Sequence, residues 1–565
     1  MRPFRLVLSL VVLLVLVACG SPPVAAPTAA PTDAPVAEQP ATTVPEVPAA
    51  PTEVPTQEPQ VQPTGPVRGG FVTRALTTEP TGLDPAGAQG SGQNVVLPYI
   101  FDTLVAADVT NTTQPLLAER WDVSEDALSI VFTLREGITF HDGTPLDADA
   151  VVYSFERLRA PESTSPMRAS LSNVTTIEAV DARTVRFDFS EPSAVFFATI
   201  TSPYAGIVSP TAVEALGEGF AQQPVGSGPF KLRAWNTGID ITLERNEDYA
   251  WAPPMVTNEG APYLDGAIFK VVPDASTQLT ALQAGEVDLI FLNLPDQITR
   301  LRQEATINLL PLTLNSLSYL GFNMVRAPFD DLLVRQAISH AIDKDVIVQA
   351  AAGGEGTPAF APMAVTLPGF DPSLQSGELA YDPEATTTLL TEAGFVQGSD
   401  GSWSKDGTPL ALTLLTFTRA PNQDIATVIQ AQLKDVGIPV EIQQLDAPAA
   451  GRQAVEGQYD LLLWRYDWND PDVLNINLSS SRIGSTNRVA YSNPEVDALL
   501  DAASRELDPA ARAQIYVEAQ RLIMADAPWQ PLYTPVDMLA VHGRVKDVVL
   551  SAMGRVLLND ATVEE

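Results

Sequence analysis

The sequence predicts an α/β protein with two or more lobes. Its 565 residues exceed what one hydrophobic core usually serves, and 45% of them are hydrophobic, which is enough for packed cores. Apolar residues with helical spacing at positions 425–433 are followed, after Gly437, by the alternating residues Ile438, Val440 and Ile442. A helix that leads into a strand in this way is typical of an α/β domain.

Two earlier segments alternate apolar and polar residues with a period of two, which predicts strands. In the first, the alternation over residues 130–134 stops at the turn-forming residues 135–137 and resumes over 138–140. This pattern predicts a hairpin. The second strand is predicted at residues 185–189.

Helix starts and ends are marked in several places. Asp382 and Asp508 each precede a proline, and proline is favoured at the first position of a helix. Gly394 follows the first of these helices and can end it in the left-handed conformation. Residues 147–158 form a further amphipathic helix in this prediction.

The N-terminus has the features of a secretory signal peptide, predicted as residues 1–18. Two arginines precede an apolar run over residues 6–17, which is shorter than the about 20 residues of a membrane-spanning helix. The run leads to Leu-Val-Ala and then Cys19, and this resembles the lipobox of bacterial lipoproteins. The resemblance implies cleavage before Cys19 and a diacylglycerol on its sulfur; the alternative is an ordinary cleavage site with an incidental cysteine.

Residues 19–66 are predicted as a lipidated cysteine followed by a disordered tether. Proline recurs every few residues in this stretch, and such a composition cannot form a packed core. An extended polyproline conformation, at about 3.1 Å per residue, would hold the folded part up to about 100 Å from the membrane. We therefore expect an extracytoplasmic protein, in the periplasm or at the cell surface, anchored to the cell membrane by Cys19.

Composition and motifs argue against several classes of function. The chain has 69 acidic and 33 basic residues, and its net charge of -36 repels the phosphate backbone of nucleic acids. His141, His340 and His542 lie far apart in the sequence, so no metal site and no cofactor is predicted. The sequence has neither a Gly-x-Ser-x-Gly motif nor a phosphate-binding loop. An enzyme, such as a tethered hydrolase, is therefore disfavoured.

A series of short segments follows the tether. Residues 117–126 read Leu-Ala-Glu-Arg-Trp-Asp-Val-Ser-Glu-Asp, and residues 132–146 read Phe-Thr-Leu-Arg-Glu-Gly-Ile-Thr-Phe-His-Asp-Gly-Thr-Pro-Leu. Further segments are found at 82–85, 225–230, 279–289 and 328–337. In this order they resemble the bacterial extracellular solute-binding proteins of family 5, the dipeptide, oligopeptide and nickel transport family. The resemblance covers nearly everything after the tether.

This resemblance implies a two-lobed, periplasmic-binding-protein-like fold of type II with an extra subdomain inserted in lobe one. The expected lobe one consists of residues 67–113, 225–312 and 535–565, the inserted subdomain of 114–224, and lobe two of 313–534. Hinge strands are expected near residues 310–323 and 528–536.

The candidate ligand site is the end of an apolar strand in lobe two, because α/β folds bind ligands at the carboxyl ends of strands. In peptide-binding members of the family, the aspartate three residues after a tryptophan holds the peptide's α-ammonium, and Asp467 has this place after Trp464. The family also lays peptide backbone beside the strand, which implies main-chain hydrogen bonds at Leu463 and Arg465. Trp468 belongs to the same aromatic loop.

Arg419 lies near the place where dipeptide binders keep an arginine for the ligand's carboxylate, although the local spacing is shorter in this chain. Two alternatives stay open. Asp467 could cap a turn while Trp464 and Trp468 only pack, and aromatic residues in an open cleft also suit sugars.

Together these expectations describe a monomeric, lipid-anchored binding subunit of an ABC importer. It would capture a small peptide or similar solute between its lobes and deliver it to the permease and ATPase subunits. The alternatives are an oligosaccharide or metal-chelate ligand in the same transport role, and a surface receptor lipoprotein without an importer.

Overall fold

The structure is a computed structural model that describes residues 67–87, 90–292, 294–376 and 379–564. The predicted signal peptide, Cys19 and the proline-rich tether lie outside these residues. Within the part of the chain that is described, no helix is both long enough and apolar enough to cross a membrane.

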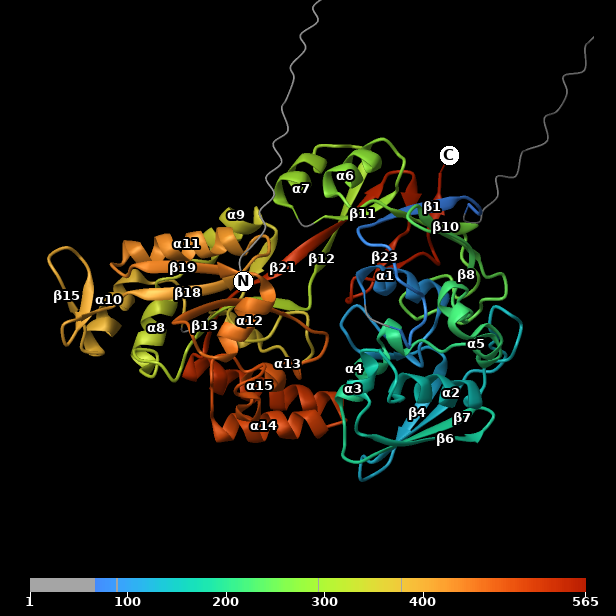
Figure 1. Ribbon diagram of the computed structural model, residues 1–565, viewed down its shortest axis with the longest axis horizontal. Helices are drawn as coiled ribbons and strands as arrows, with labels where there is room; N and C mark the ends of the chain where they lie inside the picture. The colour runs from blue at the N-terminus through green and yellow to red at the C-terminus, as the bar shows by residue number, and fades with distance from the viewer. Residues whose placement is uncertain (1–66, 88–89, 293, 377–378, 565) are drawn as a thin grey trace, which may run out of the picture. The chain divides into compact units, whose positions relative to one another are not determined.

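One continuous sheet of twelve strands joins two groups of elements. Figure 1 shows β12 and β21 running between these two groups. The strand order is β19-β18-β20-β13-β21-β11-β1-β10-β9-β8, and β12 and β14 pair with β21 outside this path. The bounds are β1 (Phe71–Leu76), β8 (Phe230–Asn236), β9 (Asp240–Arg245), β10 (Gly266–Val271), β11 (Leu289–Leu292), β12 (Ile307–Thr313), β13 (Ser316–Phe322), β14 (Gly356–Pro358), β18 (Leu412–Phe417), β19 (Val440–Leu445), β20 (Leu461–Asp467) and β21 (Trp529–His542). The fold is α/β with two lobes, as the sequence predicts.

Strand β21 belongs to both lobes. Its residues 529–533 pair with β13, and its residues 536–542 pair with β11 and β12. The chain makes its other crossing between β12 and β13, where the Leu314 amide donates to the Pro535 carbonyl at 3.0 Å. The two crossings are therefore hydrogen-bonded to each other, and together they form the hinge.

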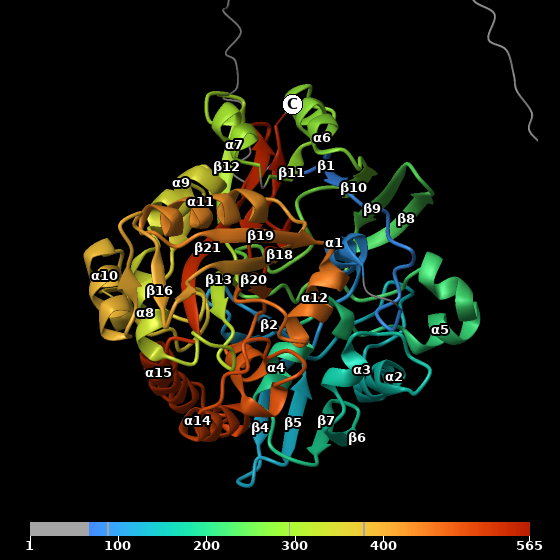
Figure 2. The same cartoon turned by 60° about the vertical axis from the view of Figure 1, so that its left-hand side comes forward.

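Helices cover both faces of the sheet in lobe two (Figure 1 and Figure 2). Leu461 and Leu463 of β20 pack into a core with α8, α9, α10 and α11, whereas Leu462 packs with α12. An apolar run without alternation is expected for a strand that is buried on both faces. The helices are α8 (Leu332–His340), α9 (Lys344–Ala352), α10 (Pro383–Glu392), α11 (Asn422–Asp435), α12 (Ala447–Val455), α13 (Val473–Leu478), α14 (Pro494–Arg505) and α15 (Pro509–Asp526).

Two of these helices begin at the predicted caps. Asp382 caps α10 and Asp508 caps α15, each directly before a proline at the first helical position. Both carboxylates accept hydrogen bonds from backbone N–H groups of the first turn, which otherwise have no partner. The two predicted starts are confirmed, and Gly394 adopts the predicted left-handed conformation after α10.

A separate four-stranded antiparallel sheet has the order β4-β5-β7-β6. Its strands and the helix beside it are β4 (Ala118–Val123), β5 (Ser129–Leu134), β6 (Val174–Asp181), β7 (Thr184–Phe189) and α2 (Ala148–Arg159). Both views place α14 of lobe two next to this small sheet and its neighbour α4 (Val195–Ile200). The Ala194 amide donates to the Ser504 carbonyl there at 2.9 Å.

The predicted hairpin between residues 130–134 and 138–140 is wrong. Strand β5 pairs with β4 and β7, and residues 138–146 form a separate turn. Ile138 and Phe140 are nevertheless buried. The alternation therefore reports which side chains enter the core, whereas the pairing partner of β5 comes from a distant part of the sequence.

A buried carboxylate ties the C-terminal segment to the sheet of lobe one. Asp288 is fully buried, and its oxygens accept hydrogen bonds from Arg544 Nε at 2.6 Å and Nη2 at 2.9 Å. The backbone N–H of Thr73 on β1 donates to the same carboxylate at 2.8 Å. The buried charge is thus compensated by a bidentate partner.

We expect Asp288→Asn to lower the free energy of unfolding by about 2–3 kcal/mol, somewhat less than the about 3–5 kcal/mol typical of breaking a buried pair, because Arg544 is partly exposed. Denaturant unfolding followed by circular dichroism measures this loss. Asp501→Asn, at an exposed position on α14, is the matched control and should change stability by less than about 0.5 kcal/mol. Equal effects of both substitutions would contradict the assignment.

Candidate functional site

Three parallel strands end along one edge of the sheet in lobe two. Strand β18 runs parallel to β19 and to β20; Arg419 follows β18, and Asp467 ends β20. Asp467 pairs with Ser316, the first residue of β13 after the hinge crossing. This edge is where α/β folds bind ligands, and it lies directly beside the hinge.

Asp467 already has two cationic partners. Its carboxylate accepts a hydrogen bond from Arg465 Nε at 2.8 Å and another from Arg419 Nη1 at 3.4 Å; Arg465 Nη2 also donates to it. Arg465 and Asp467 share a face because alternate residues of a strand point the same way. The side chain of Asp467 is 52% exposed and that of Arg465 is 11% exposed. The structure therefore brings three of the predicted residues together.

A second carboxylate, Asp537 of β21, lies within electrostatic range of these residues. We call Arg419, Arg465, Asp467 and Asp537 the hinge charge cluster. Burial raises the pKa of Asp537, Arg465 opposes this rise, and Asp467 adds to it. Burial also acts to raise the pKa of Asp467, but the charge and the hydrogen bonds of Arg465 outweigh it, so that this pKa is lowered. No described residue donates a hydrogen bond to Asp537, which leaves its charge incompletely compensated.

One edge of β20 is open beyond Leu462. Strand β20 pairs with β13 along its whole length, but within the described residues it pairs with β18 only at Leu461 and Leu462. The carbonyl of Leu463 accepts a hydrogen bond from Thr416 Oγ1 at 3.2 Å, and its side chain lies in the core. The side chain of Leu463 therefore does not face a ligand, and the main-chain role that the family resemblance implies for Leu463 stays a prediction.

The two predicted tryptophans do not join the hinge charge cluster. Trp464 points to the opposite face of β20, where its ring lies 4.6 Å from that of Phe417 and below the guanidinium of Arg488. Trp468 is 43% exposed, and its amide donates to the Asn315 carbonyl at 2.9 Å. Their part in ligand binding stays a prediction.

Three asparagines connect the lobes beside the cluster. Asn315, between the hinge strands, exchanges hydrogen bonds of 3.1 and 3.0 Å with Asn111 of lobe one and donates to Asn469 of lobe two at 3.0 Å. These three asparagines and Asp537 are not among the site residues that the sequence predicts. The available signal was weak: Asp537 is a charged residue between Val536 and Met538 in a mostly buried strand.

A cavity of about 380 Å³ lies between the lobes. Lobe one and the small sheet contribute Trp121, Phe197 and Thr201 to its wall, and lobe two contributes Asn469 and Tyr516. None of the six predicted ligand-binding residues, all within the described part of the chain, lines it. The candidate site therefore has two parts, the hinge charge cluster and this cavity.

Comparison with known proteins gives consistent matches. The family model described as bacterial extracellular solute-binding proteins, family 5 Middle, matches residues 112–485. The chain is 31% identical to heme-binding protein A of Haemophilus influenzae over 84% of this chain and 89% of that protein. It is 30% identical to the glutathione-binding protein GsiB of Escherichia coli over 82% of this chain and 88% of that protein.

Among solved structures, the periplasmic binding protein DppA from Helicobacter pylori in complex with the peptide STSA superposes with a TM-score of 0.66. It is 28% identical to this chain and the match covers 88% of this chain and 99% of that one.

We expect Arg465→Met to raise the pKa of the Asp467 carboxyl, because it removes the main positive charge and hydrogen-bond donor next to that group. A carbon-13 NMR titration of labelled aspartate measures the pKa. Arg452→Met, an exposed position on α12, is the control and should leave it unchanged. An unaltered titration in the Arg465 variant would show that the pair does not form in solution.

Proposed function

Because the chain belongs to the bacterial extracellular solute-binding proteins of family 5, we propose that it is the substrate-binding subunit of an ABC importer. It captures a small peptide-like solute between its lobes and delivers it to the permease. Cys19, with its acyl chains, and the proline-rich tether hold it at the outer side of the membrane. Its relatives are solute-binding transport proteins, and no catalytic step is part of this proposal.

The observation that supports a peptide-like solute most is the open edge of β20 beside the hinge charge cluster. A peptide in extended conformation can add its main chain to a free strand edge without contact to its side chains. Its α-ammonium then meets Asp467 and Asp537, and a carboxylate meets Arg419 or Arg465. Each ligand charge finds a partner of opposite sign, which offsets the cost of taking it from water.

The ion pairing within the cluster fits this role. Arg465 and Arg419 keep Asp467 compensated until an ammonium replaces them. The arginines released in this way are free to bind the ligand's carboxylate, so a zwitterion leaves no charge buried alone. The glutathione-binding and peptide-bound relatives support the same ligand class.

Closure would follow from contacts that the solute makes with both lobes. Such contacts exist only in the closed form, so the solute shifts the population towards closure by its difference in affinity for the two forms. Asn111, Asn315 and Asn469 lie where the lobes meet at the hinge. The importer would then recognise the closed form.

We expect Asp467→Asn to weaken binding of trialanine with a free N-terminus by about tenfold or more, equivalent to about 1.4 kcal/mol, because it removes the charge that holds the ammonium. N-acetylated trialanine should lose less than about twofold, since it carries no ammonium. Isothermal titration calorimetry measures both affinities. Asp435→Asn, an exposed position on α11, is the control. Equal losses for both peptides would refute the ammonium role.

Peptide affinity should also fall as the pH is lowered from neutral towards the ordinary carboxyl pKa of about 4. Burial raises the pKa of Asp537, so this carboxyl takes up a proton first and loses the charge that attracts an ammonium. Peptide affinity is thus highest at pH values above the pKa of Asp537, where the carboxylate is charged, and declines at lower pH. Titrations over this range should show a shallower decline for Asp537→Asn than for Asp435→Asn. The same decline in both would exclude Asp537 from the site.

A further inference from the structure

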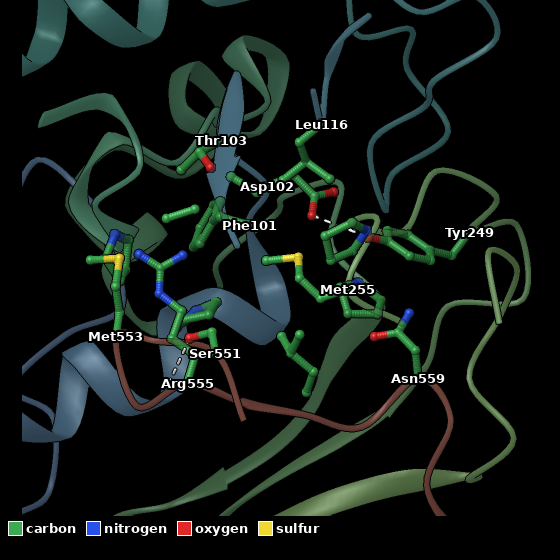
Figure 3. Close-up of a pocket in the computed structure, with 17 residues that line it drawn as sticks. Phe101, Asp102, Thr103, Leu116, Tyr249, Met255, Ser551, Met553, Arg555 and Asn559 are labelled. Carbon is green, nitrogen blue, oxygen red and sulfur yellow. Dashed lines mark hydrogen bonds between the residues drawn. The ribbon is translucent and has the colours of Figure 1, made fainter. Parts of the chain in front are cut away.

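A smaller chamber of about 50 Å³ adjoins the interlobe cavity inside lobe one (Figure 3). The walls of the two spaces share Ala107 and Met553. Most of the chamber wall is apolar, and its polar groups include Asp102, Arg555 and Asn559. Its volume exceeds the about 10–15 Å³ that one water needs, so a group of a few heavy atoms fits.

The guanidinium of Arg555 enters this chamber without a counter-ion. Figure 3 shows it extending from the C-terminal segment towards Phe101, between Met553 and Met255. Among the described residues its side chain has one hydrogen-bond partner, the carbonyl of Thr201, which lines the larger cavity. Burial lowers the pKa of Arg555 to about 10, and no carboxylate offsets this effect. A mostly buried, uncompensated cation is costly, and it is conspicuous in a chain with 69 acidic residues.

The other polar groups of the chamber wall differ in how far they are satisfied. Asn559 is 2% exposed, and its Nδ2 has no hydrogen-bond partner among the described residues. Asp102, in contrast, accepts hydrogen bonds from Trp251 at 2.8 Å, Ser227 at 3.1 Å and Tyr249 at 3.3 Å. The carboxylate is therefore supplied with donors. Among the described residues, Asn559 Nδ2 has no acceptor and the Arg555 side chain has only the Thr201 carbonyl.

The interlobe cavity next to the chamber has an aromatic surface that an apolar group can contact. The rings of Trp121 and Phe197 lie 5.5 Å apart in its wall. Three charged residues line it: Arg512 donates to Asp470 at 2.8 and 2.6 Å, and Glu506 accepts a hydrogen bond from the Asp508 amide at 2.8 Å. A volume of about 380 Å³ lies within the about 300–1,000 Å³ of small-molecule pockets, which are mostly apolar with few polar anchors.

We propose that the interlobe cavity and the chamber together bind an apolar group that ends in a carboxylate, with Arg555 as the counter-ion and Asn559 as a second donor. The inference rests on the proposed function, because it adds a second recognition element for the same solute. It narrows the substrate class to amphiphilic acids, such as a peptide with a large apolar side chain and a carboxylate. The apolar part displaces water from Trp121 and Phe197, and the carboxylate supplies the missing acceptor.

Two probes with the same apolar body test this assignment on the full chain. Naphthylacetate carries a carboxylate, and naphthylacetamide is its neutral counterpart. In calorimetric titrations the wild type should bind naphthylacetate at least tenfold more tightly than the amide. Arg555→Met should reduce this preference to less than twofold. Arg555→Lys keeps the positive charge on a shorter side chain and should retain part of the preference. Arg233→Met, an exposed arginine on β8, is the matched control and should keep the full preference.

Trp121→Ala should weaken both probes by a similar factor, since both contain the apolar body. If Arg555 serves only to hold the Thr201 carbonyl at the end of α4, its substitution will change both affinities equally, and the inference falls. Absence of a charge preference in the wild type also overturns it, even where trialanine binds in an Asp467-dependent manner. A charge preference that depends on Arg555, without any trialanine binding, would overturn the peptide proposal and support this one.

Discussion

The two chain crossings between the lobes, which the hydrogen bond from Leu314 to Pro535 joins, fix where the candidate site lies. Strand β21 pairs with strands of both lobes, so the two lobes share one continuous sheet at these two crossings. Asn315 and Asp537 lie at or next to this bend, and β20 ends beside it at Asp467. A solute held by the cluster would therefore act at the hinge itself.

The hinge charge cluster and the chamber differ in whether their charged side chains have partners of opposite sign. In the hinge charge cluster, opposite charges lie close enough to compensate one another before any ligand arrives. In the chamber, Arg555 has no such partner. A compensated cluster suits ligands that carry both signs of charge, whereas a lone cation suits an anion. A ligand that contacts both the hinge charge cluster and the cavity would bind β20 and the cluster with one end and the apolar cavity with the other.

Local signals in the sequence were sufficient for several elements. The starts of α10 and α15 depend on an aspartate and a proline that are adjacent in the chain, and the family resemblance carried the two-lobed fold. The hairpin at 130–140 failed because period-two burial does not specify a pairing partner. Arg465 and Asp467 were found because they are two residues apart on one strand. Asp537 and Arg555 meet their surroundings only through tertiary structure, so no local pattern marks them.

The internal pairing of Asp467 with Arg465 has a kinetic consequence for a carrier. As a solute departs, the guanidinium can return to the carboxylate while the old contact stretches, so that neither ion passes through an unpartnered state. Under the proposed function this return would lower the barrier to dissociation, and differences in affinity between related complexes arise mostly from dissociation rates. Such a receptor gives up some residence time and gains quick unloading once its cargo reaches the membrane.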